Sequence, residues 1–138
     1  MTLYDIVTAF KNIAKKQPNI NYVNDGDIYS LNSIPNLEYG VFFVTQSNHS
    51  QNEDTISYTL TLYYIDRLNA DGSNTLQIQS NAIMALNNII NNFNQLYDVE
   101  IEYNINYTTF VHRFQDDCGG AFANVTIITD NELGVCGY

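Results

Sequence analysis

TISYTLTLYYID, residues 55–66, alternates between large apolar and small polar side chains over most of its length. The apolar positions of this segment are Ile56, Tyr58, Leu60, Leu62 and Tyr64. The positions between them include Ser57, Thr59 and Thr61. Successive side chains of a strand point to opposite faces of a sheet. The segment is therefore predicted to be a β-strand with one face in the core.

A second strand is predicted just before it, at VFFVTQ, residues 41–46, where β-branched and aromatic residues again dominate. The polar stretch between the two segments consists of Ser47, Asn48, His49, Ser50, Gln51, Asn52, Glu53 and Asp54. We therefore predict an antiparallel hairpin whose tip is a long polar loop at residues 47–54.

Two amphipathic helices are predicted on either side of this hairpin in the sequence. Residues 3–16 have apolar side chains at helical spacing, with Thr2 and Asp5 as a candidate capping box and Pro18 beyond the end. The second helix is expected to run from a cap at Ser73 or Asn74 to about residue 94. Its outer face is mostly Asn and Gln, which suits contact with a neighbouring protein.

The remaining segments complete an α+β fold. Residues 20–37 are irregular and are expected to form a loop with at most one short strand. DVEIEYNINY, residues 98–107, alternates strictly and predicts a strand, and AFANVTIITD, residues 121–130, predicts the last strand. We therefore expect residues 1–138 to form a single domain, with two main helices packed on a mostly antiparallel sheet.

The charge of the chain excludes several classes of function. Asp and Glu number 15 and Lys and Arg number 5, which gives a formal net charge of −10 at pH 7. Such a surface repels phosphate backbones, so nucleic-acid binding is not expected. MTLYDIVTAF, residues 1–10, carries no basic region or small-residue cleavage site, so we do not expect a signal peptide. The sequence shows no apolar run of membrane-spanning length and no phosphate-binding loop after a strand. We expect a cytosolic protein without a membrane or nucleotide partner.

HRFQDDCGGAFANVTI, residues 112–127, admits two interpretations. In the first, Cys118 is the nucleophile and His112 the base of a small thiol hydrolase. In the second, the segment is a backbone bend: Asp116 and Asp117 favour a turn, Gly119 and Gly120 permit unusual backbone angles, and Cys118 fills a small buried gap. The bend is the simpler interpretation, because no known nucleophile signature surrounds the cysteine. Cys118 and Cys136 are expected to be free thiols.

Neither a metal nor another cofactor is expected. Residues 67–78 match part of a calcium-binding loop, but Arg67 and Ile78 occupy its first and last ligand positions. Carboxylates occur in pairs at Asp25 and Asp27, Glu53 and Asp54, and Asp116 and Asp117. They would form a metal or acid-base site only if folding brought the pairs together.

Several short motifs, in this order, resemble small head-tail connector proteins of Bacteroides phages, including those of crAss-like phages. The motifs are Pro18-Asn19-Ile20, Gly26-Asp27-Ile28, Glu38-Tyr39 before a hydrophobic strand, Asp66-Arg67-Leu68 with Asp71 and Ser73-Asn74, Ile78-Gln79-Ser80, and Phe114 with Asp116 and Gly119-Gly120. The resemblance is to the neck-ring and the tail-terminator or tail-completion type, and it spans nearly the whole chain.

The resemblance implies a non-enzymatic virion protein of the neck or tail that is assembled in the host cytoplasm. Such a subunit would belong to a six-fold or twelve-fold ring, with portal, neck or tail proteins as neighbours and genome DNA passing through without specific binding. We expect uncovered edges of the hairpin and of the final strand to pair across subunits, and residues 47–54 to reach a neighbouring ring. Carboxylates facing the lumen would repel the DNA. The alternative is that the acidity only keeps the subunit soluble before assembly.

A binding module is the alternative interpretation. The chain has 11 Tyr, whose rings offer stacking surfaces for sugars. In that case the chain would be a non-catalytic sugar- or receptor-binding module of a phage or bacterial surface.

Overall fold

The computed structural model describes residues 1–102, 104–114 and 116–131. Its elements are α1 (Leu3–Lys15), β1 (Tyr22–Asp25), the 3₁₀ helix η1 (Ile28–Ser33), β2 (Val41–Gln51), β3 (Thr55–Arg67), α2 (Thr75–Leu96), β4 (Glu100–Ile101), β5 (Tyr107–Arg113) and β6 (Cys118–Asp130). The described residues thus form three helices and a six-stranded, mostly antiparallel sheet. The predicted α+β class is confirmed.

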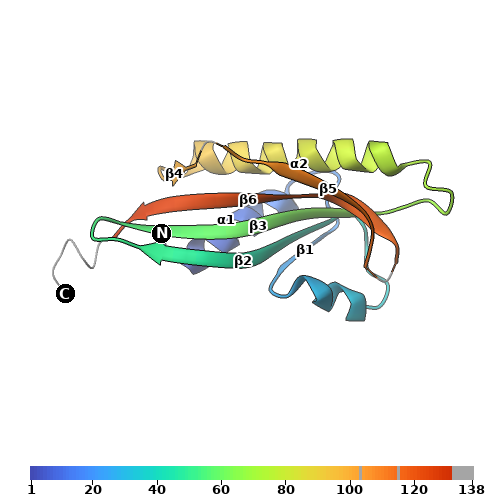
Figure 1. The fold of residues 1–138 in the computed structure, drawn as a ribbon, viewed down its shortest axis with the longest axis horizontal. Coiled ribbons are helices and arrows are strands. Elements are labelled where there is room, and N and C mark those ends of the chain that lie inside the picture. Colours follow the sequence, from blue (N-terminus) through green and yellow to red (C-terminus); the bar gives the residue numbers. More distant parts are fainter. Residues whose placement is uncertain (103, 115, 132–138) are drawn as a thin grey trace.

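The sheet is built around β3 and β6, which pair over their whole length (Figure 1). β2 pairs antiparallel with the other side of β3, and β1 adds to β2 in parallel. β4 and β5 both pair with the far side of β6, β5 near its start and β4 near its end. The final strand is therefore in the interior of the sheet, and the expectation that its edge is uncovered is wrong.

Both main helices begin where the sequence predicts. The Thr2 hydroxyl accepts a hydrogen bond from the Asp5 backbone N–H at 3.2 Å, and the Asp5 carboxylate accepts one from the Thr2 backbone N–H at 2.9 Å. This is the predicted capping box. Asn74 occupies the N-cap of α2, but its side chain accepts from the Asn69 backbone N–H at 2.8 Å instead of capping the helix. Among the described residues, no helix is both long and apolar enough to cross a membrane.

The main core lies between the two helices and one face of the sheet. The rings of Phe10 in α1 and Phe93 in α2 stack with their centroids 4.3 Å apart. The alternate side chains of β3 face them, and Leu60 and Leu62 are fully buried. One face of β3 is therefore in the core, as its alternation predicts.

The opposite face of the sheet is covered by η1 at one end. There Ile28 and Leu31 of η1 belong to a second buried cluster with Phe43, Ile65 and Phe110. Beyond this cluster the face carries hydroxyl and amide side chains of β3 and β6. The Thr59 and Thr126 hydroxyls share a hydrogen bond of 3.1 Å, and the Thr61 hydroxyl donates a hydrogen bond to the Asn124 side-chain oxygen at 2.6 Å.

Of the strand predicted at residues 98–107, the structure contains the two residues of β4 and the first residue of β5. β5 continues to Arg113, where no strand was predicted. The Glu102 N–H still donates to the Thr126 carbonyl at 3.1 Å, and pairing resumes at Tyr107 opposite Ala123. Between the Glu102–Thr126 and Tyr107–Ala123 pairs, β6 has two residues, 124 and 125, whereas the chain opposite it has four, 103–106. The longer segment cannot stay in register with β6. Residue 103 lies outside the described residues.

Candidate functional site

Asp116 and Asp117 lie in the turn that joins β5 to β6, as predicted. Asp117 has a φ of 58° and Phe114 a φ of 69°, so the chain reverses through left-handed conformations. The Asp116 carboxylate accepts a hydrogen bond from the Tyr39 hydroxyl at 2.5 Å. The Asp117 carboxylate pairs with His112 Nδ1 at 2.8 Å. Both aspartates therefore hold the turn in place.

The two glycines are placed differently from the prediction, because they lie within β6 and not in the bend. A Cβ added to Gly120 would lie 1.9 Å from the Tyr64 carbonyl oxygen on β3, and the φ of Gly120 is 154°. A Cβ on Gly119 would first meet the flexible end of Leu68 at 3.0 Å. Gly120 is therefore required by the close approach of two strands, and the turn precedes it.

Within the described ranges, the hydrogen bonds of His112 and Cys118 do not join these two side chains. His112 pairs with Asp117, and Cys118 is only 1% exposed. Burial raises the pKa of the Cys118 thiol, which keeps it protonated at neutral pH. A nucleophilic cysteine needs the opposite shift. Cys118 is a free thiol, as expected, and Cys136 lies outside the described residues.

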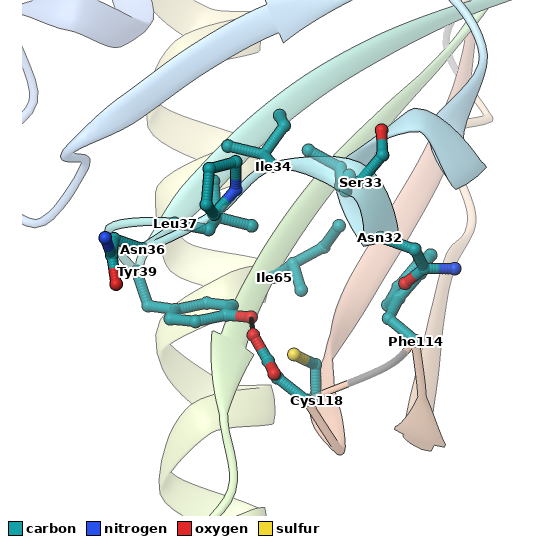
Figure 2. Close-up of a pocket in the computed structure, with 12 residues that line it drawn as sticks. Asn32, Ser33, Ile34, Asn36, Leu37, Tyr39, Ile65, Phe114 and Cys118 are labelled. Atoms are coloured by element: carbon teal, nitrogen blue, oxygen red, sulfur yellow. Dashed lines mark hydrogen bonds between the residues drawn. The ribbon is translucent and has the colours of Figure 1, made fainter.

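A cavity of about 360 Å³ opens between the 34–39 loop, the end of η1 and the β5–β6 turn (Figure 2). Ile34, Leu37 and Ile65 form apolar walls, while Tyr39 crosses the cavity toward Asp116 and Cys118. Burial and the hydrogen bonds to Asp116 and Cys118 raise the pKa of Tyr39 above its ordinary value. The phenol therefore stays protonated and serves as a tether between loop and turn.

The other carboxylate pairs are spread over the molecule. Asp25 accepts from the Lys11 ammonium at 2.7 Å, and Asp27 accepts from the Tyr29 backbone N–H at the start of η1. Glu53 and Asp54 lie at the tip of the hairpin. Within the described ranges, no three His, Cys, Asp or Glu side chains gather in a geometry that could hold a metal.

The loop predicted at residues 47–54 is mostly strand. β2 continues to Gln51, with a bulge between Gln46 and His49, and β3 starts at Thr55. Asn52 closes the short tip, because its side-chain oxygen accepts from the backbone N–H groups of Asp54 and Thr55. Asn131, after β6, donates to the Asn52 carbonyl at 3.1 Å. Backbone N–H and C=O groups can form the hydrogen bonds of a strand whatever the side chains are. The polar side chains of residues 47–51 therefore led to the wrong prediction of a loop.

The hairpin has one free edge, formed by residues 45–51 of β2. β1 pairs only with residues 41–44, and no described strand covers the outer side of β2 beyond them. Soluble proteins usually protect such an edge with charged residues or proline. Residues 45–51 contain no Lys, Arg, Asp, Glu or Pro. We call this stretch the free β2 edge.

The outer face of α2 is a second surface without charge. The helix contains no charged residue over its whole length, in a chain whose net charge is −10. Leu76 and Met84 are exposed on it, at 79% and 61%, and Leu96, the last residue of the helix, is 65% exposed. Methionine enrichment and depletion of charge are typical of the core of a protein–protein interface.

No protein-family model matches this chain. No curated protein of related sequence was found either.

Proposed function

We propose that the chain is a structural subunit of a ring in the neck or tail of a phage, where it joins head to tail around the DNA channel. The sequence motifs support this class of protein. The observation that carries the proposal is the free β2 edge, because its backbone groups can pair with another chain without demanding particular side chains.

The surface charge supports assembly through particular contacts. Two chains with a net charge of −10 each repel one another over most of their surfaces. The free β2 edge and the outer face of α2 lack charge and escape this repulsion. A ring gives each of these surfaces a partner on the neighbouring subunit. Head-to-tail contacts form a closed ring when the rotation between neighbouring subunits is a whole fraction of 360°.

The same acidity suits a channel through which DNA slides. Carboxylates at the lumen would repel phosphates, and the five basic residues of the chain are too few to form a continuous phosphate-binding surface. In this role the protein needs no cofactor. Neighbouring portal, neck or tail proteins would contact the two open ends of the ring.

Negative-stain electron microscopy of the purified protein tests the proposal. Class averages with a central hole and six-fold or twelve-fold symmetry are expected. Compact particles of single-subunit size that bind sugars on a glycan array would contradict it and would support the sugar- or receptor-binding alternative.

A further inference from the structure

The outer strands β2 and β4 lie in register with one another across the sheet. Reading across the sheet, Ser50 of β2 pairs with Ser57, Ser57 with Ile128, and Ile128 with Glu100 of β4. In the next row, His49 pairs with Tyr58, Tyr58 with Ile127, and Ile127 with Ile101. The free β2 edge and β4 therefore occupy opposite ends of the same rows.

We infer that the free β2 edge of one copy adds to the outer edge of β4 in the next copy. The inference rests on the proposed function and names the contact that builds the ring. β2, β3, β6 and β4 alternate in direction, so β4 runs antiparallel to β2. A neighbour placed by rotation about an axis near the strand direction would bring its β2 antiparallel to β4, with Ser50 beside Glu100 and no rise along the axis.

The β4 side has space for an added strand. No described strand covers the outer side of β4, and a groove of about 440 Å³ lies between this edge and α2. Asn91 and Asn94 form the α2 wall of the groove. On an added β2, the side chains of His49 and Gln51 would point to the helix side, because they share rows with residues of the helix-side face. Their polar ends would meet these two amides.

The distribution of charge favours contact between the free β2 edge of one copy and β4 of the next over contact between two β4 edges. The β4 edge carries Glu100 and is followed by Glu102, whereas the free β2 edge contains no carboxylate. Contact between two β4 edges would bring these glutamates together, which is unfavourable. Contact between β2 and β4 avoids that repulsion.

Disulfide cross-linking tests the contact. Ser50→Cys and Glu100→Cys are introduced into one chain, with Cys136→Ser to remove the thiol outside the described region; Cys118 is buried and stays. Within one chain these positions are separated by three strand spacings, roughly 14 Å. A disulfide needs Cα atoms within about 7 Å, so only two copies can form it. Mild oxidation should give a series of covalent oligomers that ends in a closed ring. The control pair, Ser33→Cys with Glu100→Cys, should give no such oligomers.

A charge series provides a second readout. Ser50→Glu should weaken each contact by about 1.5- to 5-fold, since it opposes a glutamate to Glu100 across the strands, and Glu100→Lys in the same chain should restore assembly. Ser33→Glu adds the same charge away from the edge and is the matched control.

The outcomes separate the contact from the ring itself. Rings that form but do not cross-link between positions 50 and 100 would overturn the inference and leave the proposed function intact. Cross-linked dimers from Ser50→Cys alone would mean that two β2 edges pair with each other, which also overturns it. A protein that never assembles would contradict the proposed function as well.

Discussion

Tyr39 and Asp116 are 77 positions apart in the sequence and are joined by a hydrogen bond of 2.5 Å between hydroxyl and carboxylate. This bond ties the loop before β2 to the turn between β5 and β6. It closes one side of the buried cluster under η1, where Tyr39 packs beside Ile65 and Cys118. The end of the sheet farthest from the hairpin tip is held by this tether.

Tyr39→Phe removes the tether and keeps the ring. A hydrogen bond to a charged group contributes about 1.5–3 kcal/mol, and this one is partly exposed. We therefore expect the free energy of unfolding to fall by about 1–2 kcal/mol and Tm by about 3–8 °C. Thermal unfolding followed by circular dichroism measures the change. Tyr29→Phe, at an exposed ring of η1, is the matched control and should leave Tm unchanged. Equal effects of the two substitutions would mean that the tether contributes nothing.

Gly120→Ala should destabilise the protein far more than Gly119→Ala. The new Cβ at position 120 would overlap the Tyr64 backbone carbonyl, which cannot move without breaking the pairing of β3 with β6. We expect a loss of about 3 kcal/mol or more at position 120 and about 1 kcal/mol at position 119, where the end of Leu68 must shift and the Phe110 carbonyl oxygen would lie 3.3 Å from the new Cβ. Urea unfolding of both variants measures the difference. Similar losses would show that strand approach is not what requires Gly120.

Stability should fall at alkaline pH because of two tyrosines, the buried Tyr64 and the partly buried Tyr39. Burial, with Asp66 nearby, raises the pKa of Tyr64 to about 12, and the pKa of Tyr39 is raised as well. An ordinary tyrosine ionises at about pH 10, so the unfolded chain loses these protons first. The contribution is complete below about pH 10 and is lost as the pH rises toward the folded values.

Urea midpoints measured between pH 8 and 11 check this dependence. The wild-type midpoint should decline above about pH 10, and the decline should be shallower in the Tyr39→Phe, Tyr64→Phe double variant. An identical slope in both proteins would exclude these two phenols as its source.

Cys118 should react slowly with thiol reagents in the folded protein. In a Cys136→Ser background, DTNB should label Cys118 only as fast as the protein unfolds, because the thiol is buried and its pKa is raised. His112→Ala should not change the rate of labelling other than through stability. Rapid labelling of the folded protein that depends on His112 would revive the thiol hydrolase.

Local pattern predicted the elements that depend on local physics. The capping residues Thr2 and Asp5 and the alternation of residues 55–66 predicted α1 and β3, because each signal acts within a few residues. The alternation of residues 98–107 predicted one continuous strand, but only part of this segment pairs with β6. The register with a distant strand cannot be read from the local pattern. Residues 47–51 looked like a loop because their pairing uses backbone atoms.

The candidate site was predicted less completely. Asp116 and Asp117 were placed in a turn from their own chemistry, but no pattern in the sequence pairs Tyr39 with Asp116 across so many residues. The glycine pair was noticed for its conformational freedom, whereas the structure uses Gly120 for its lack of a side chain beside Tyr64. The free β2 edge had a signal, the absence of charge at residues 45–51, which becomes meaningful only when the strand order is known.

Multi-angle light scattering over a wide range of protein concentration tests the ring most directly. The proposal predicts a discrete particle with the mass of six or twelve subunits at high concentration. Ser50→Glu should raise the protein concentration at which this particle forms. A single-subunit mass at every concentration, unchanged by that substitution, would contradict it.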